Sequence, residues 1–207
     1  MRAFDKEVIG NLAKWKQLAD DTKQPHIGLV TAAASDVFTL TRAVIYALSI
    51  SKKADVKDIA AAIGHNLADA LNKSKDLINK DPKLKNHAKC VSDGLGLLQW
   101  YLQGDAFEFA KESCVQIDYF GNKVLSEQVA ANTEWYKCYR HTLCGATLEF
   151  IKNKFEQGNP FDNKGDDFEK NFKKLIGGAP APAETPKHEE EKKAIKPQPT
   201  TKPATPA

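Results

Sequence analysis

The stretch Pro25–Leu48, PHIGLVTAAASDVFTLTRAVIYAL, decides the fold. Proline is favoured at the first position of a helix, where its missing N–H group would have no partner in any case. Apolar and small residues then recur at a heptad-like spacing: Val30, Ala34, Val37, Thr41, Val44 and Leu48. Because this spacing places them on one helical face, the stretch predicts a long and mostly buried helix.

Helical spacing continues on both sides of this stretch, through about residue 157. Apolar residues at i, i+3, i+4 and i+7 predict one helix before it and four after it. The first helix is expected to end near Asp21. The third should be capped by Asp55 and end near Asp81, and the fourth should run from Leu84 to Leu102. The fifth should start after Gly104-Asp105, and the sixth near Asn132. Six helices with short links predict an all-α fold, an antiparallel bundle of about six helices.

The fourth and sixth helices carry specific packing predictions. Gly94 and Gly96 each weaken the helix propensity of the fourth by about 1 kcal/mol, which indicates that a neighbouring helix packs closely against them. For the sixth, the α-helical period predicts a core face made by Trp135, Tyr139, Thr142, Ala146 and Phe150.

The pattern changes after Gly158. Residues 158–165 are typical of an ordered loop, and Phe168 and Phe172 indicate one further short helix that ends before Gly177-Gly178. The segment beyond holds seven of the ten prolines and no aromatic residue, so it cannot bury enough surface to offset the entropy of ordering it. We therefore expect a helical domain over residues 1–176 and a disordered Pro/Lys/Glu-rich tail over residues 177–207.

Charge and cysteine usage exclude several classes of protein. Lys+Arg 30 against Asp+Glu 27 gives a net charge of +3, which is too small and too dispersed for a nucleic-acid-binding face. The amino terminus has no apolar signal region, and no run of about 18 apolar residues predicts membrane insertion. The four cysteines include no C-x-x-C pair, which favours a reducing compartment. The sequence thus predicts a cytoplasmic protein.

Two His-x-x-Cys pairs are the strongest candidates for chemistry. His87 with Cys90 and His141 with Cys144 could form a His2Cys2 zinc set if their helices faced each other. Apolar neighbours place the first pair on a core stripe, where buried thiols and histidines are ordinary. No catalytic triad or phosphate-binding loop accompanies them. We expect no catalytic, cofactor or metal site, and hence a binding protein instead of an enzyme.

The segment around residue 122 favours recognition by another macromolecule. Asn122, Lys123 and Glu127 lie beside a core stripe that contains Gly121 and Val124. Helix packing does not require polar residues there, so we expect them on one exposed side.

These same residues carry a resemblance to a known family. Phe120–Glu127 (FGNKVLSE) is similar to a family segment Tyr-Thr-Asn-Arg-Val-Leu-Lys-Glu, and Glu134–Tyr139 (EWYKCY) is similar to Asp-Trp-Val-Lys-Ala-Tyr. Asn86-His87, Leu98–Trp100 and Ala3–Asp5 agree with the family in order and spacing. From about residue 3 to 175 the chain resembles the amino-terminal helical folded domain of cyclase-associated proteins.

The resemblance implies a module of the actin cytoskeleton that acts by binding. It would engage actin decorated with cofilin/ADF near the pointed end of a filament and promote disassembly, with a possible link to adenylyl cyclase. The implied protein-binding residues are Asn122, Lys123, Glu127, Lys137 and Lys164. Trp135 is assigned mainly to packing.

The sequence also departs from the family pattern. Lys123 replaces an Arg and so loses a bidentate contact to a carboxylate, and Phe161 replaces a Trp in the loop 158–165. No counterpart is seen of the family's oligomerising coiled coil, profilin-binding polyproline, actin-monomer motif or β-sheet domain. Two other functions stay open: a helical-bundle carrier of a small apolar ligand, and a signalling scaffold for a cyclase or kinase without direct actin activity.

Overall fold

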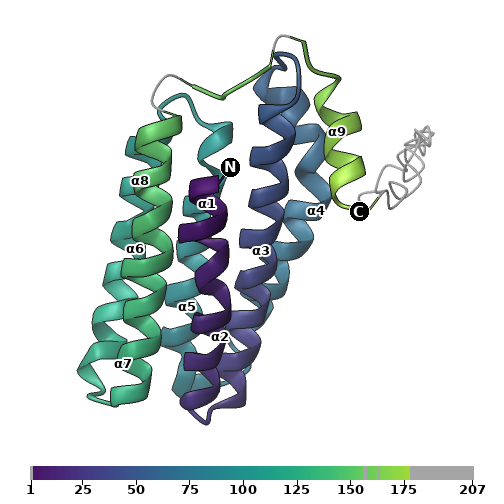
Figure 1. Ribbon diagram of the computed structural model, residues 1–207. Helices are drawn as coiled ribbons and strands as arrows, with labels where there is room; N and C mark the ends of the chain where they lie inside the picture. The colour runs from purple at the N-terminus through teal and green to yellow at the C-terminus, as the bar shows by residue number, and fades with distance from the viewer. Residues whose placement is uncertain (1, 156–157, 163, 178–207) are drawn as a thin grey trace, which may run out of the picture.

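The computed structural model describes residues 2–155, 158–162 and 164–177 (Figure 1). Over these ranges the regular structure is helical, and strand-like pairing is confined to an isolated parallel bridge between Ser51 and Asp166. The predicted tail, apart from Gly177, lies outside the described residues. The domain boundary near residue 176 therefore stays a prediction.

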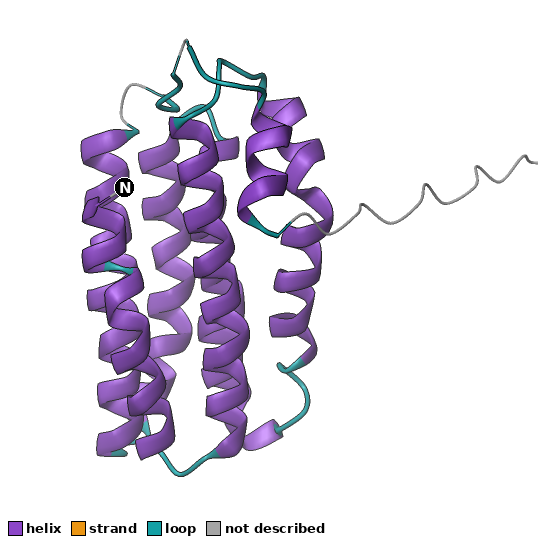
Figure 2. Ribbon diagram, turned by 45° about the vertical axis from the view of Figure 1, so that its right-hand side comes forward, coloured by secondary structure: helices purple, strands orange, loops and turns teal. Residues whose placement is uncertain are grey.

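Helical segments join end to end into six long rods and one short helix. The six rods are α1 (Arg2–Glu7), η1 (Ile9–Asn11) and α2 (Leu12–Asp21); α3 (Pro25–Ser49); α4 (Val56–Asp76); η2 (Pro82–Leu84), α5 (Lys85–Gly94) and η3 (Leu95–Leu102); α6 (Ala106–Ser126); and α7 (Ala130–Lys137), η4 (Cys138–Cys144) and α8 (Gly145–Lys154). The short helix is α9 (Phe168–Leu175). The rods run up and down beside one another (Figure 2). The prediction of an all-α bundle is confirmed.

Helix α3 lies at the centre of the bundle and contacts α2, α4, α5 and α9. It begins at Pro25, and its buried residues include the predicted seam from Val30 to Leu48. By length and composition α3 could also cross a membrane, with a mean hydropathy of 1.3 over its most apolar window, yet 56% of that window is buried inside the bundle. Such burial is typical of the core helix of a globular domain.

The fourth rod changes geometry halfway. α5 ends at Gly94, and η3 continues as a 3₁₀-helix, in which three residues per turn align Leu95, Leu98 and Tyr101 in one buried row. A Cβ atom on Gly94 would lie 2.4 Å from Ile117 Cγ1, so the prediction of close packing is confirmed there. It is wrong for Gly96, where a Cβ atom would meet nothing within 4 Å.

The sixth rod contains a π-helical segment, η4, which shifts its buried face by one residue. Trp135 and Tyr139 are buried as predicted, but the next buried positions include Leu143 and Thr147, whereas the predicted Thr142 and Ala146 are only half-buried. In a π-helix the hydrogen bonds run from i to i+5, so each such turn holds an extra residue. The predicted core face was therefore wrong at Thr142 and Ala146 and correct again at Phe150.

Helix α9 is fixed to the connection between α3 and α4. The buried side chain of Asn171 donates hydrogen bonds to the carbonyl of Ile50 (3.2 Å) and to Ser51 Oγ (2.9 Å). Phe168 and Phe172 stack with their ring centroids 5.9 Å apart and are buried against the bundle. These contacts order a helix that would be too short to be stable alone.

Replacing Gly165 with alanine should loosen this attachment. The new Cβ atom would lie 2.2 Å from the carbonyl oxygen of Ile50, a backbone atom that cannot rotate away. We expect the free energy of unfolding, measured in urea, to fall by about 1–3 kcal/mol, as for other overpacked sites. Gly64→Ala is the matched control: it meets nothing within 4 Å and lies inside α4, so it should stabilise slightly. Equal stability of the two variants would contradict the prediction.

Candidate protein-binding surface

The C-terminal half of α6 carries the first two predicted binding residues. Asp105 caps the start of the helix by accepting a hydrogen bond from the backbone N–H of Glu108 (3.0 Å). Near its other end, Gly121 faces α7: a Cβ atom there would lie 2.1 Å from the ring of Tyr136, so only glycine permits this contact. With Gly121 facing α7, the neighbouring Asn122 and Lys123 are exposed, as the sequence predicted.

Two aromatic rings hold the side chain of Lys123. Its Nζ lies 4.4 Å from the ring centroid of Tyr119 and 5.2 Å from that of Phe120, and it donates a hydrogen bond to Tyr119 Oη (3.3 Å). Lys89 of α5 reaches the same cluster, with Nζ 4.9 Å from the Phe120 centroid. An ammonium group near an aromatic face is attracted by the ring quadrupole. The result is a positively charged aromatic patch shared by α5 and α6.

Glu127 is exposed, as the sequence predicted, but its carboxylate also contacts two residues of the bundle. Its side chain is 32% exposed, and Oε2 lies 3.3 Å from Asn132 Nδ2 and 3.5 Å from Nε2 of the fully buried His87. The helix ends one residue earlier, at Ser126, and Gln128 takes a left-handed conformation (φ 56°), which changes the direction of the chain. Glu127 is thus exposed like Asn122 and Lys123, but it lies past the end of α6.

Glu127 belongs instead to a chain of polar side chains across the end of the bundle. Gln24, at the turn before α3, donates a hydrogen bond to Asn132 Oδ1 (3.2 Å), and Asn132 donates to Glu127. Burial raises the pKa of Glu127, while burial and the nearby His26 lower the pKa of His87 to about 4. His87 is thus neutral at pH 7, and its contact with Glu127 is not a pair of opposite charges.

The other two predicted binding residues lie outside α6. Lys137 is exposed on α7 and pairs with Glu134 of its own helix (3.2 Å). Lys164 is exposed in the loop before α9, which crosses the top of the bundle in Figure 1, whereas the turn between α6 and α7 is at the bottom. Asn122 and Lys123 are therefore neighbours on α6, whereas Lys137 lies on α7 and Lys164 lies at the opposite end of the bundle.

An ion pair joins α6 to the sixth rod beside Gly121. The guanidinium of Arg140 donates to both carboxylate oxygens of Asp118, at 2.6 and 2.9 Å, and Tyr136 donates to the same carboxylate (3.2 Å). The hydrogen bonds from Arg140 lower the pKa of Asp118. Asp118 is therefore already neutralised and adds little negative charge to this side of α6.

The structure does not assemble the alternative zinc set. His141 is exposed, whereas His87, Cys90 and Cys144 are buried. Within the described parts of the chain, no group of three or more His, Cys, Asp or Glu side chains is placed to hold a metal ion. Burial raises the pKa of the Cys90 and Cys144 thiols, which disfavours the nucleophilic thiolate.

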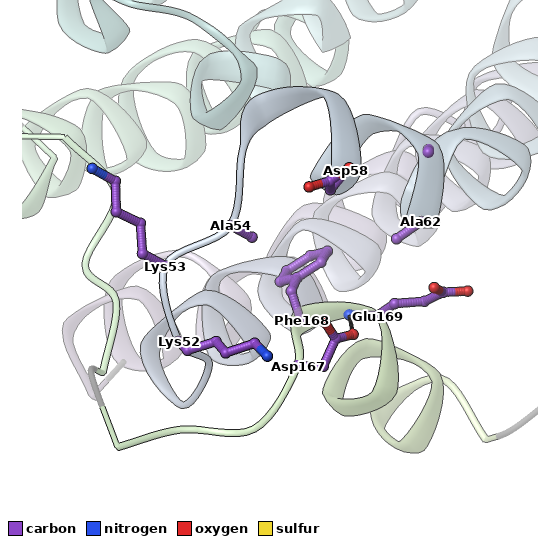
Figure 3. A pocket seen from close by; sticks show the side chains of 9 residues that line it. Lys52, Lys53, Ala54, Asp58, Ala62, Asp167, Phe168 and Glu169 are labelled. Carbon is purple, nitrogen blue, oxygen red and sulfur yellow. Dashed lines mark hydrogen bonds between the residues drawn. The ribbon is translucent and has the colours of Figure 1, made fainter.

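A pocket of about 350 Å³ lies between the connection from α3 to α4 and the start of α9 (Figure 3). Lys52 and Lys53 line it together with Asp58 and Asp167, and the ring of Phe168 points into it. Asp167 already accepts hydrogen bonds from the backbone N–H groups of the first turn of α9. Its carboxylate thus occupies the position that a phosphate would take at a helix start.

The carrier hypothesis requires space between the helices. The larger of the described depressions, about 610 Å³, lies between α1 and α8 and is lined mostly by exposed residues such as Glu7, Glu149 and Lys154. The bundle axis is filled by aromatic side chains, and Trp15, Trp100 and Trp135 are fully buried. This packing gives the carrier hypothesis no support.

Sequence reasoning missed three contributors to this surface. Phe120 belongs to the family-like motif without a predicted role, and neither Tyr119 nor Lys89 is among the predicted binding residues. The spacing offered one signal, because Tyr119 and Lys123 are four residues apart and so lie one turn apart on the same helical face. The contact between Lys89 of α5 and Phe120 of α6 could not be predicted from the spacing within either helix.

The fold is that of a helical-bundle domain already known from solved structures. The N-terminal domain of the adenylyl cyclase-associated protein (CAP) from Dictyostelium discoideum matches with a TM-score of 0.73 and 19% identity, covering 81% of this chain and 97% of that one. A CAP N-terminal domain whose crystal structure indicates variable oligomerisation matches with the same TM-score and identity, covering 81% and 92%. At this identity the likeness shows the fold alone.

The family follows from the sequence. The family model described as "CAP, N-terminal domain" matches residues 4–158, about three quarters of the chain. The protein therefore belongs to the CAP N-terminal domain family, which is non-catalytic. A comparison with curated proteins gives no match.

Proposed function

We propose that this domain binds cofilin-decorated actin filaments in the cytoplasm, near their pointed ends, and promotes loss of subunits. CAP proteins regulate actin turnover with cofilin, and membership of that family supports the proposal. Binding can speed disassembly only if the domain has a higher affinity for filament ends with weakened contacts than for intact ends. The domain would thus act by binding alone, without breaking a covalent bond of its partner.

The observation that carries the proposal is the exposed pair Asn122 and Lys123 on α6. Both side chains face solvent, and neither is needed for packing, which Gly121 and Val124 provide on the opposite side. Lys137 and Lys164 are included as outlying contacts. Glu127 takes part by fixing the turn after α6 through Asn132, with its exposed oxygen left for the partner.

The test is pointed-end disassembly of cofilin-decorated filaments in the presence of the full chain. The double variant Asn122→Asp with Lys123→Glu should slow disassembly by about tenfold or more, because a charge reversal in an interface costs more than simple truncation. Its thermal unfolding should match that of the unmodified protein, since both residues are exposed. Lys73→Glu, an exposed change on α4, is the control.

Two results would overturn the proposal. One is that the unmodified chain neither co-sediments with cofilin-decorated filaments nor speeds their disassembly. The other is that the double variant and Lys73→Glu behave alike, which would remove the α6 surface from the function.

A link to adenylyl cyclase is a second candidate, which the name of the matched Dictyostelium protein favours. This would make the domain a signalling scaffold whose partner is an enzyme. Pull-down of purified adenylyl cyclase by the full chain tests it, and retention equal to that of a protein-free resin would exclude it.

A further inference from the structure

The face of α6 that carries Lys123 also exposes a row of apolar side chains. Val115 is 64% exposed and Tyr119 is 57% exposed. Val115, Tyr119 and Lys123 follow one another at intervals of four residues. Residues at this spacing lie one above another on a helix. Single exposed apolar residues are ordinary, but Val115 and Tyr119 lie one turn apart, with the half-buried Phe120 next to Tyr119, and together they form an apolar strip that bundle packing does not use.

The charge beside this strip is positive and uncompensated. Among the residues that the structure describes, no carboxylate lies within 4.0 Å of Lys123 Nζ. The second cation, Lys89, is paired with Asp93 at 3.1 Å, and the carboxylate of Asp118 is occupied by Arg140. An acidic group from outside would therefore find an ammonium group here that forms no ion pair with a described carboxylate.

The ammonium group of Lys123 is also held in position before any partner arrives. Its contacts with the ring and hydroxyl of Tyr119 restrict a side chain that would otherwise lose rotamer freedom on binding. An aromatic residue next to a positioned cation is the composition typical of energetically dominant sites in protein interfaces.

We propose, resting on the function proposed above, that the row Val115, Tyr119 and Lys123 receives a segment of the cofilin-decorated filament that places a carboxylate next to an apolar side chain. The carboxylate binds the ammonium group of Lys123. The apolar side chain covers Tyr119 and Val115, one and two turns further toward the start of α6. The partner is thus a protein segment of mixed acidic and apolar character, read along a single helix.

Co-sedimentation of the full chain with cofilin-decorated actin filaments, at about 50 and 200 mM salt, tests the carboxylate contact and the apolar contact. Lys123→Gln should weaken binding by about tenfold at low salt and make it less dependent on salt, because a charge pair is lost. Val115→Ser combined with Tyr119→Ser should weaken binding by about tenfold at both salt concentrations, because apolar contact is lost.

Matched controls come from other faces of the bundle. Lys73→Gln on α4 removes an exposed lysine, and Leu29→Ser on α3 removes an apolar side chain that is 57% exposed, as Tyr119 is. Both should bind as the unmodified chain does. Thermal unfolding of each variant verifies that it is folded.

The outcomes separate this inference from the function on which it rests. If the unmodified chain binds and the Val115/Tyr119 variant matches Leu29→Ser, the acidic-apolar segment is excluded while the proposed function stands. If Lys123→Gln binds as Lys73→Gln does, the carboxylate contact is excluded in the same way. If the unmodified chain does not bind at all, the proposed function and the inference both fail.

Discussion

Replacing Trp135 with alanine is expected to lower the free energy of unfolding by about 3–5 kcal/mol, the range for deleting a buried tryptophan. The side chain is fully buried and stacks on Trp15 with ring centroids 6.0 Å apart. Its indole N–H donates to Thr31 Oγ1 (2.8 Å), and its backbone carbonyl accepts from the indole of Trp15 (3.2 Å). Truncation would leave a cavity where α2, α3 and the sixth rod meet.

Urea unfolding at pH 7.5 measures this loss, and Trp135→Phe is the informative control. Phenylalanine keeps an aromatic ring against Trp15 but cannot donate to Thr31, so its cost should be smaller, about 1–3 kcal/mol. A loss below about 1 kcal/mol for the alanine variant would show that the site collapses around the smaller side chain.

Acid should destabilise the protein through His87 well above the range where carboxylates titrate. The pKa of His87 is lowered to about 4 in the folded state, against 6.5 for an unperturbed histidine. Between these values the unfolded chain binds a proton that the folded chain does not, so stability rises with pH. From pH 7 to pH 5 the expected loss is roughly 2 kcal/mol.

The loss is best measured as a difference between variants. In His87→Gln the free energy of unfolding should decrease less from pH 7 to pH 5, by roughly 2 kcal/mol. Glu127, whose pKa is raised, contributes in the opposite direction, and the comparison between the two proteins reduces its effect. Parallel pH profiles for the unmodified protein and His87→Gln would contradict the assignment.

Much of the fold could be predicted because local signals agree with the packing. Pro25 marks the start of α3, Asp105 caps α6, and the apolar period of α3 matches its buried face. The burial of Leu143 and Thr147 could not be predicted, since an α-helical period does not reveal the π-helical segment Cys138–Cys144. The 3₁₀ geometry of η3 is a similar case.

The binding surface was predictable only where a side chain's position depends on its own helix. Asn122 and Lys123 are exposed because Gly121 and Val124 on the same helix are buried. Glu127 lies just past the helix end, where the left-handed Gln128 and contacts from His87 and Asn132 decide its direction. Those partners come from α5 and α7, so spacing within α6 could not reveal them.

The attachment of α9 to α3 and α4 decides where additions to this protein can be placed. Gly177, the last described residue, follows a helix that lies beside α4, across the bundle from α6 and α8 (Figure 1). A fluorophore or affinity handle joined there would start on the side remote from Lys123. Immobilisation through that point should therefore leave α6 facing outward, which suits surface-based assays of the binding proposed here.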